Sequence, residues 1–425
     1  MTARARENLN CEKAFLTGIV FDGPREVTPF KELGELADTA GARVVGTLTQ
    51  RRESPDRATY LGKGKATELA AAAKEAGAHL ILVDADLSPA QVRNLEKVVD
   101  LRVVDRTELI LDIFASHART KQSKLQVELA QMEYLLPRLK RMWVHLGRIE
   151  GGIGMRGPGE KQLEVDRRVI GRKIAALQRQ LSEISVRKER EVKTREDKYR
   201  AAIVGYTNAG KSTLMNRLTG AGVREGDQLF LTLDTKTVWW PVGGWGVFLS
   251  DTVGFIRKLP HHLVASFHAT LEEARQADLL LHVIDATDPE MMLKVASVEE
   301  VLARLGMGET PRIRVFNKID LPHDRAMVAR MTGEGKGMGL KVSAVSGEGI
   351  PALAELVLRQ VLRGGHRVLV KMPHGAGDLL AWLSRETHVM ERNFRENGVE
   401  FTVLVDDQGL SRLKAEKRCR VKALD

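Results

Sequence analysis

Cysteine is scarce in this chain of 425 residues, and it has no long apolar run. Cys11 and Cys419 stand near opposite ends, so neither a disulfide framework nor a cysteine-ligated metal site is expected. The longest apolar stretches, such as LLLHVI at residues 279–284, fall far short of the roughly 20 residues that span a bilayer. The first twenty residues lack the apolar core of a secretory signal. We therefore expect a cytoplasmic protein that does not enter a membrane.

Positive charge is concentrated in one part of the sequence. The formal net charge is +10, and residues 138–200 hold 18 lysines and arginines against 9 acidic residues. Such a segment is typical of proteins that contact nucleic-acid phosphates, and a solvated helical face is the plainer alternative.

The first 120 residues alternate apolar runs with helix-like runs, which predicts a small α/β domain with a largely parallel sheet. The last predicted helix should have Ser88 as its N-cap and Pro89 as its first residue. GKGK at residues 62–65 has only two glycines, so we interpret it as a turn and not as a phosphate loop. The expected strands are FLTGIVF, VVGTLT, HLILVDADL and RVVDRTELILDIF, and the expected helices are PFKELGELADTAG, KATELAAAAKEAG and SPAQVRNLEKVV.

Residues 121–198 are expected to form a long antiparallel helical hairpin with a glycine-rich tip. Apolar residues recur at intervals of three and four on both sides of the tip, as in a coiled coil, so two helices can bury them against each other. Pro137 should kink the first helix. The seam residues are Leu125, Leu129, Met132, Leu136, Leu139 and Trp143 before the tip, and Leu163, Ile170, Ile174, Leu177, Leu181 and Ile184 after it.

A phosphate-binding pattern opens the next segment, residues 199–364. GYTNAGKS matches G-x-x-x-x-G-K-[ST], follows the apolar run AAIV and precedes the helix-like TLMNRL, as such a loop requires. Backbone N–H groups would face the phosphates, Lys211 would reach the β- and γ-phosphates, and Ser212 would ligate Mg²⁺. The predicted loop residues are Gly205, Tyr206, Thr207, Asn208, Ala209, Gly210, Lys211 and Ser212.

Two further motifs are expected at the γ-phosphate. After the strand VFLS, Asp251 would hold Mg²⁺ through water and the Gly254 amide would sense the γ-phosphate. Thr232 would join the metal only when a γ-phosphate is present. The predicted catalytic residues are thus Lys211, Thr232 and Gly254, and the predicted metal ligands are Ser212 and Thr232. The two motifs comprise Asp251, Thr252, Val253 and Gly254, and Phe230, Leu231, Thr232, Leu233 and Asp234.

The base is predicted to be guanine. The Asp320 carboxylate of NKID can accept hydrogen bonds from N1 and N2 of guanine, and adenine offers no such pair of donors. A backbone N–H of the SAVSG segment could reach the guanine O6. The residues assigned to the base are Asn317, Lys318, Ile319 and Asp320, and Ser343, Ala344 and Val345.

Phe255 stands where Ras-like proteins place a glutamine that orients the attacking water. Phenylalanine cannot orient water by hydrogen bonding, so we expect slow unaided hydrolysis, with help from a switch-region group or a bound partner. The alternative is that Phe255 simply packs against a neighbouring helix, and both can hold.

Two other classes of function are weighed against a GTP switch. The pattern G-x-G-x-x-G, which is the spacing of a dinucleotide-binding enzyme, is formed by Gly152, Gly154 and Gly157. A dinucleotide site would need a strand before this pattern and an acidic residue about 20 positions after it, whereas heptad seams flank it here. An enzyme that modifies or processes RNA would need a catalytic cysteine, a metal cluster or an acid/base set outside this domain. The adjacent His261 and His262 lack ligand spacing.

Several long motifs resemble the HflX family of GTPases. They are YLGKGKATEL, DLSPAQVRNLEK, VVDRTELILDIFASHARTKQSKLQVELAQMEYLLPRL and GGIGMRGPGEKQLEVDRR, together with FLTLD and DTVGF. The resemblance extends from about residue 13 to 350 and is weaker after residue 366. Lys161 stands where a common form of the glycine motif has threonine. The resemblance implies a cytoplasmic GTPase that binds the large (50S) ribosomal subunit and separates stalled ribosomes under heat or other stress.

We therefore expect a multidomain α/β protein with GTP and Mg²⁺ as cofactors, acting as a monomer. Its parts would be an N-terminal α/β domain (1–120), a basic helical hairpin (121–198), a P-loop GTPase domain (199–364) and a small α+β C-terminal domain (365–425). Ribosomal RNA would be contacted by the basic residues 138–200 and the loop from Gly151 to Gly159. The cations of the stretch at residues 151–164 are Arg156 and Lys161.

Overall fold

The computed structural model divides the chain into two compact units. The first comprises Met1–Glu189, Gly226–Asp234 and Phe255–Thr270, and the second comprises the remaining residues. The structure describes residues 12–20, 30–139, 158–193, 199–223, 226, 229–230, 236–243, 245–257, 273–333, 338–361, 366–395, 398–405 and 407–424. Within these ranges, none of the helices combines the length and the apolarity that a membrane span requires.

The N-terminal domain is a four-stranded sheet in the order β2-β1-β3-β4, and every pair of neighbours is parallel, as expected. One face of the sheet packs on α2 and α3 through a cluster that includes Leu69, Ile81 and Leu95. Ser88 caps α3 and Pro89 begins it, as predicted. The elements are β1 (Lys13–Val20), α1 (Lys31–Thr39), β2 (Arg43–Arg51), α2 (Lys63–Glu75), β3 (Leu80–Val83), α3 (Pro89–Val99), β4 (Arg102–Asp105) and α4 (Arg106–His117).

The expected long strand RVVDRTELILDIF is wrong beyond its fourth residue. Only β4 is a strand, and the chain turns directly into α4 because the Asp105 side chain caps the helix by accepting a hydrogen bond from Glu108 N at 2.9 Å. The apolar residues that suggested a strand, including Leu109, Ile113 and Phe114, recur at helical spacing and are buried. The expected turn at GKGK is wrong, because Gly62 is the N-cap of α2 and residues 63–65 form the first turn of that helix.

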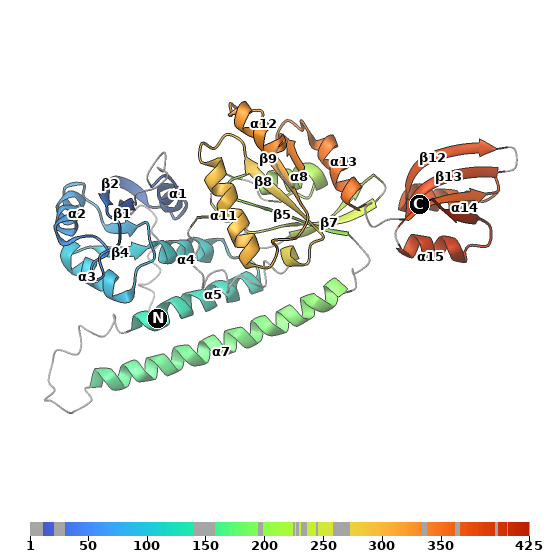
Figure 1. The fold of residues 1–425 in the computed structure, drawn as a ribbon. Helices are drawn as coiled ribbons and strands as arrows, with labels where there is room; N and C mark the ends of the chain where they lie inside the picture. Colours follow the sequence, from blue (N-terminus) through green and yellow to red (C-terminus); the bar gives the residue numbers. More distant parts are fainter. Residues whose placement is uncertain are drawn as a thin grey trace. The chain divides into compact units, whose positions relative to one another are not determined.

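The helical hairpin contains α5 (Lys121–Leu135), the 3-10 turn η2 (Leu136–Arg138) and α7 (Pro158–Lys193). Leu129 and Met132 of α5 pack on Leu177 of α7, with other predicted seam residues around them, so the two helices lie side by side (Figure 1). At Pro137 the α-helix changes to a 3-10 turn, and Leu139 directly after this turn is again helical. Trp143 lies outside the described residues, as does the side chain of Leu163.

Hydrogen bonds fix the end of the first hairpin helix to the N-terminal domain. Arg138 donates to the Asp105 carboxylate at 3.0 Å and to the Leu87 carbonyl at 2.7 Å. Tyr134 donates to the other carboxylate oxygen of Asp105 at 3.0 Å, and the Arg138 guanidinium lies 3.6 Å from the Tyr134 ring centre. Burial raises the pKa of Asp105 to about 6, although Arg138 opposes the shift. The 3-10 turn at Pro137 thus places Arg138 where it can donate to Asp105 at the end of β4.

The P-loop domain is built on a six-stranded sheet in the order β10-β9-β8-β5-β7-β6. All neighbours are parallel except β6 and β7. The order reverses at β5, which has β7 on one side and β8 on the other, and ligands of such sheets bind where the strand order reverses. The elements are β5 (Tyr199–Gly205), α8 (Lys211–Thr219), β6 (Lys236–Val242), β7 (Trp245–Asp251), β8 (Leu279–Asp285), α11 (Met291–Arg304), β9 (Arg312–Asn317), α12 (Arg325–Gly333), β10 (Met338–Lys341) and α13 (Ile350–Val361).

The C-terminal domain is a four-stranded antiparallel sheet in the order β12-β13-β11-β14 with two helices. The sequence predicts one helix over GDLLAWLSRETHVMERNFRENG, and this prediction is wrong in its second half, because the residues after Thr387 pair with β13 as a strand. The final strand was not predicted. The elements are β11 (His366–Met372), α14 (Gly377–Glu386), β12 (His388–Arg395), β13 (Gly398–Val405), α15 (Asp407–Ala415) and β14 (Arg420–Ala423).

Candidate nucleotide-binding site

The predicted motifs meet at one edge of the P-loop sheet. β5, β7, β8 and β9 are parallel neighbours, so their carboxyl ends lie along the same edge. β5 ends at Gly205, where the phosphate loop begins, β7 ends at Asp251, and β9 ends at Asn317. The motifs are therefore adjacent in space although they are separated by tens of residues in sequence.

The phosphate loop joins β5 to the N-terminus of α8, and two of its glycines are sterically required. A Cβ on Gly205 would lie 2.3 Å from the carbonyl oxygen of Val283, and one on Gly210 would lie 2.3 Å from Asn317 Nδ2. Both glycines also have positive φ, at 153° and 87°. Because Lys211 begins α8, the partly positive end of the helix and its unpaired N–H groups face the loop, as anion binding requires.

Lys211 is almost fully buried, with 7% of its surface exposed. Its Nζ donates a hydrogen bond to the Tyr206 carbonyl at 2.6 Å across the loop. Burial lowers the pKa of Lys211 to about 8, and the nearby Asp251 carboxylate opposes this shift. A buried ammonium that is costly to keep charged gains more from an anionic ligand than a solvated lysine does.

The oxygen atoms beside Lys211 fit a magnesium ion. Ser212 Oγ donates to Asp251 Oδ2 at 2.8 Å, and Oδ1 of the fully buried Asp251 has no hydrogen-bond partner among the described residues. Burial raises the pKa of Asp251, and Lys211 lowers it. Hydroxyl and carboxylate oxygens are ligands that Mg²⁺ prefers, and few protein ligands suffice where substrate phosphates complete the shell. These two residues would hold the ion, which would neutralise charge on the phosphates.

Gly254 lies close to the phosphate loop. A Cβ on this residue would lie 2.7 Å from a methyl carbon of Thr207 and 2.9 Å from Lys211 Nζ, so only glycine lets the backbone approach so closely. The buried Thr252 anchors the motif by donating to the Ile203 carbonyl at 2.7 Å. The backbone of DTVG is thus held against the lysine that is predicted to contact the γ-phosphate.

Asn317 connects the predicted base-binding segments to the phosphate loop. Its Nδ2 donates to the Ala209 carbonyl at 3.0 Å, and its Oδ1 accepts from Ala344 N at 3.0 Å. Lys318 Nζ donates to the Asn208 carbonyl at 2.8 Å. The NKID segment is therefore hydrogen-bonded both to the loop that should hold the phosphates and to the SAVSG segment.

The remaining base-binding residues differ in exposure. Ile319 is half-buried, Asp320 is exposed and Val345 is 73% exposed, whereas Ser343 is buried. Ser343 N donates to the Glu348 carbonyl at 2.9 Å. The backbone N–H groups of Ser343 and Ala344 therefore already donate to protein acceptors. Of the three predicted residues, this leaves the N–H of Val345 as the candidate donor to the guanine O6. The exposed Asp320 carboxylate is placed to meet a base from solvent.

Asp285 is a site residue that no sequence motif indicated. It ends β8 between the strands that carry the phosphate loop and Asn317, and it forms an ion pair with Lys318 Nζ at 2.7 Å. The carboxylate thus holds the lysine that bridges to the phosphate loop. Its position at the carboxyl end of the apolar strand LLLHVID was the signal that could have found it.

Some predicted residues lie outside this arrangement. Of the FLTLD motif only Phe230 is described, and it belongs to the first compact unit, as does the buried Phe255. Residues 231–234, the tip loop residues 151–157 with Arg156, the Lys161 side chain, and His261 and His262 lie outside the described residues. The buried Phe255 ring agrees with the view that this side chain packs and does not orient water.

Three family models match successive parts of the chain. A model described as the N-terminal part of a GTP-binding GTPase matches residues 28–115, and one described as the middle region of a GTP-binding GTPase matches residues 117–195. A third, described as a 50S ribosome-binding GTPase, matches residues 200–318. A GTP-binding protein from the archaeon Sulfolobus solfataricus, solved in complex with GDP, is 25% identical with a TM-score of 0.43, and the alignment covers 83% of this chain and 99% of that one.

Relatives of known family match nearly the whole chain. GTPase HflX of Caldanaerobacter subterraneus is 43% identical over 97% of this chain and 92% of its own length. GTPase HflX of Escherichia coli K12 is 44% identical over 87% of each chain, and that of Magnetococcus marinus is 46% identical over 91% of this chain and 90% of its own. The chain therefore belongs to the HflX family of GTPases, and it is a GTP-hydrolysing protein with GTP and Mg²⁺ as cofactors.

Proposed function

We propose that this protein is a cytoplasmic, monomeric GTP switch that binds the large ribosomal subunit and its RNA through the basic hairpin and separates stalled ribosomes under stress. GTP would favour the binding-competent state, and hydrolysis would favour release. The match of residues 200–318 to the 50S ribosome-binding GTPase model and the HflX relatives support this proposal.

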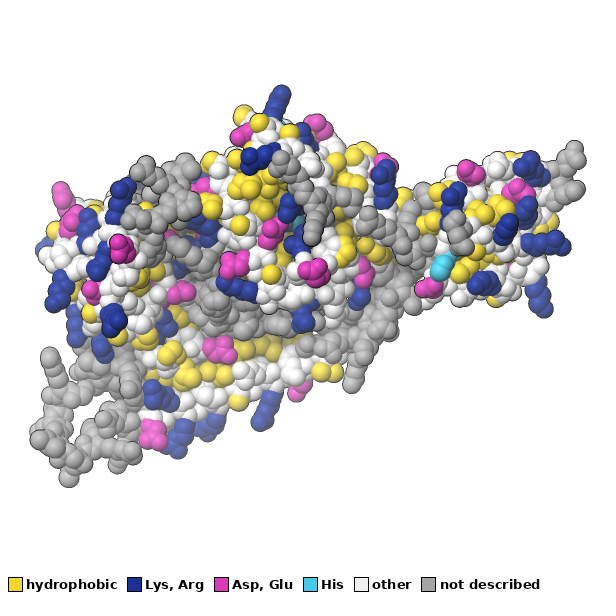
Figure 2. Space-filling view, in the orientation of Figure 1, with side chains coloured by type: hydrophobic (Ala, Val, Ile, Leu, Met, Phe, Trp, Pro, Cys, Tyr) yellow, Lys and Arg dark blue, Asp and Glu magenta, His cyan; other side chains and the backbone are white. Residues whose placement is uncertain are grey.

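The observation that carries the proposal is the exposed face of α7. Arg168, Arg172 and Arg179 follow one another at intervals of four and seven residues, so they lie on one side of the helix, and all three are exposed. Val165 and Val169 on the same side are 42% and 48% exposed. Figure 2 shows lysine and arginine side chains gathered along this helix. A straight row of arginines suits contact with RNA phosphates.

The alternatives have less support. The G-x-G-x-x-G segment lies between α5 with its 3-10 turn and α7, so no described strand precedes it as a dinucleotide fold requires. Among the described residues, no cluster of three or more His, Cys, Asp or Glu could hold a metal for RNA-modifying chemistry. The GTP switch remains the function that the site supports best.

Neutralising the exposed arginines is expected to weaken ribosome binding and its salt dependence. Removal of one phosphate-binding cation should reduce the slope of log affinity against log salt by roughly 0.7 to 0.9. We therefore expect R168Q/R172Q/R179Q to lower the slope by roughly 2 to 3 if all three arginines bind phosphate. The measurement is co-sedimentation of the GTP-analogue complex with large subunits between about 50 and 200 mM salt, a range in which such interactions are decisive.

A charge-matched control separates this effect from net charge. Lys65, Arg304 and Arg359 each pair with a carboxylate one helical turn away, so K65Q/R304Q/R359Q removes the same charge without touching α7. The control should retain the wild-type slope. An equal reduction in both triple variants would count against α7 as the RNA-binding surface, and wild-type protein remaining at the top of the gradient would contradict ribosome binding altogether.

The affinity for GTP should fall at high pH. Because the pKa of Lys211 is lowered to about 8, the free protein loses this positive charge above that pH, while bound phosphates favour the charged form. Affinity should therefore be constant below about pH 7 to 8 and fall by about tenfold for each further pH unit. Calorimetry at about pH 9 in buffers of different ionisation enthalpy should show uptake of one proton. Equal affinity at about pH 7 and pH 9.5 would contradict the assignment.

A further inference from the structure

Two short segments next to the γ-phosphate motifs are buried in the first compact unit. Phe255, Ile256 and Arg257 directly follow Gly254 in the chain, and Leu229 and Phe230 precede Thr232 by three and two residues. The side chains of Leu229, Phe230, Phe255 and Ile256 are each no more than 3% exposed. In a switch GTPase, such neighbouring segments are free to become ordered or disordered as the γ-phosphate binds or leaves.

Arg106 holds the segment that follows Gly254. This buried arginine, the first residue of α4, donates from Nη2 to the Arg257 carbonyl at 2.9 Å. Its Nη1 pairs with Asp84 at 2.7 Å, and its Nη2 also pairs with Glu32 of α1. Glu32 in turn lies 3.9 Å from the Arg257 guanidinium. One guanidinium therefore binds the backbone of residue 257 and two carboxylates of the N-terminal domain.

Phe114 and Thr39 hold the segment that precedes Thr232. The rings of Phe114 and Phe230 meet edge to face, with centres 4.7 Å apart and planes at 81°. Leu229 N donates to Thr39 Oγ1, at the end of α1, at 3.3 Å. Phe230 has a φ of 58°, which a residue with a side chain rarely adopts, so its backbone needs such support.

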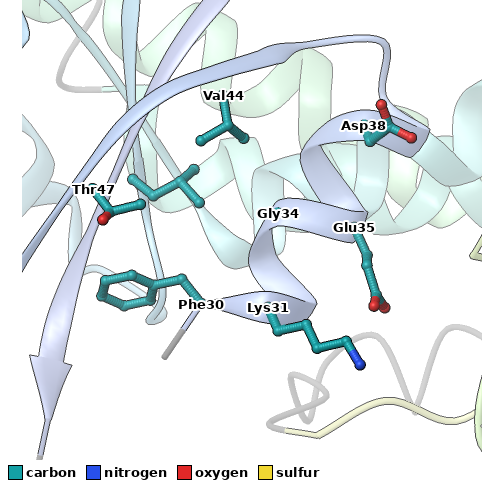
Figure 3. A pocket seen from close by; sticks show the side chains of 8 residues that line it. Phe30, Lys31, Gly34, Glu35, Asp38, Val44 and Thr47 are labelled. Carbon is teal, nitrogen blue, oxygen red and sulfur yellow. The ribbon is translucent and has the colours of Figure 1, made fainter. Parts of the chain in front are cut away.

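Helix α1 thus contacts both segments. Glu32 contacts Arg257 and Thr39 contacts Leu229, while Leu33 and Leu36 are buried in the domain core. Another side of α1 faces an open hollow of about 520 Å³ towards β2, where Lys31 and Asp38 are among the lining residues (Figure 3). The contacts with residues 229 and 257 are made by side chains distinct from those that line the hollow.

We infer that Arg106 and Phe114 of the N-terminal domain are positioning residues for the GTP-bound state. They act through the backbone at residues 257 and 230, and neither touches the nucleotide. Holding the neighbours of Gly254 and Thr232 in place reduces the conformational freedom that these two residues lose when they contact a γ-phosphate. GDP has no γ-phosphate, so its binding does not draw on this support.

The test compares two nucleotides in the free protein, without ribosomes. In R106K the side chain keeps its charge but loses the planar fork that reaches three acceptors, and in F114L the site stays apolar but loses the edge-to-face ring packing. Each substitution should lower the affinity for a non-hydrolysable GTP analogue by about three- to tenfold, as removal of one such interaction does. The kcat for GTP hydrolysis should fall by a similar factor. The Kd for GDP should remain unchanged.

Two further variants keep the result interpretable. R102K replaces another arginine of the same domain, which forms an ion pair with Glu108 at 2.9 Å. This ion pair involves neither residue 229 nor residue 257, so R102K should bind both nucleotides as the wild type does. If R106K does not fold, the same comparison of the two nucleotides is made with F114L and with T39V, which removes the hydrogen bond between Leu229 N and Thr39 Oγ1. An equal loss of affinity for GDP and for the analogue would show a purely structural role and overturn the inference. Unchanged analogue binding, or faster hydrolysis, would overturn it as well. Because no ribosome is present, failure here leaves the proposed ribosome function untouched.

Discussion

Replacement of Lys211 by methionine is expected to slow GTP hydrolysis by roughly 10² to 10³-fold, the effect of removing one partner from a buried charge pair. Methionine retains most of the apolar stem but carries no ammonium group. The buried Lys211 Nζ donates a hydrogen bond to the Tyr206 carbonyl of the loop and lies near Asp251. No other described side chain of the loop is placed to supply this charge. Single-turnover hydrolysis and the Kd for GTP measure the effect.

The folded state itself should tolerate this change. Burial already disfavours the charged form of Lys211, so K211M should not lower the melting temperature of the free protein appreciably. K371M removes one charge from the C-terminal domain, where Lys371 lies beside Glu400, and serves as the control with normal hydrolysis. Hydrolysis by K211M within about threefold of the wild type would rule out the assigned role of Lys211.

Replacement of Asp320 by asparagine is expected to exchange the base preference of the protein. In the proposed role, the carboxylate would accept from both N1–H and the 2-amino group of guanine, and asparagine could accept only one of these bonds. Hydrogen bonds to a charged group contribute about 1.5 to 3 kcal/mol each, so loss of one of them should lower GTP affinity roughly 10- to 150-fold. Xanthine carries a carbonyl at position 2, which can accept from the asparagine amide, so XTP should bind better than GTP.

A neighbouring carboxylate provides the control for this exchange. Asp324, four residues further along the same loop, accepts from Met327 N at 3.0 Å at the start of α12. D324N should keep the preference for GTP. Competition binding with GTP, XTP and ATP measures both variants beside the wild type, and an unchanged GTP preference in D320N would mean that another residue reads the base.

The strongest sequence predictions came from motifs whose chemistry requires particular residues at fixed spacing. Gly205 and Gly210 are needed because a Cβ at either position would collide with Val283 or Asn317, and this requirement is visible in the sequence as a pattern. The seam leucines of the hairpin were also recognisable, because their spacing of three and four can be read without knowledge of the partner. Such features depend on local geometry.

The errors have a common physical origin. RVVDRTELILDIF contains enough apolar residues for either a strand or a helix, and the N-cap at Asp105 decides between them at the fourth residue. The residues after Thr387 have helical spacing, but pairing with β13 makes them a strand. At Pro137 the sequence indicated a distortion of the helix but not its form, a 3-10 turn that the bonds of Arg138 to Asp105 and Leu87 accompany. In each case interactions beyond the local propensity of the segment decided its conformation.

The sequence by itself determined the chemistry of the nucleotide site, because a phosphate loop, a metal-binding carboxylate and a guanine-reading carboxylate each need a residue type that little else can replace. Only the tertiary structure decided what supports that site. Asp285 is recognised by its place between two parallel strands, and Arg106 by its bond to a carbonyl 151 residues away. Neither residue belongs to a nucleotide-binding motif, and their role arises from burial and partners that only the folded chain provides.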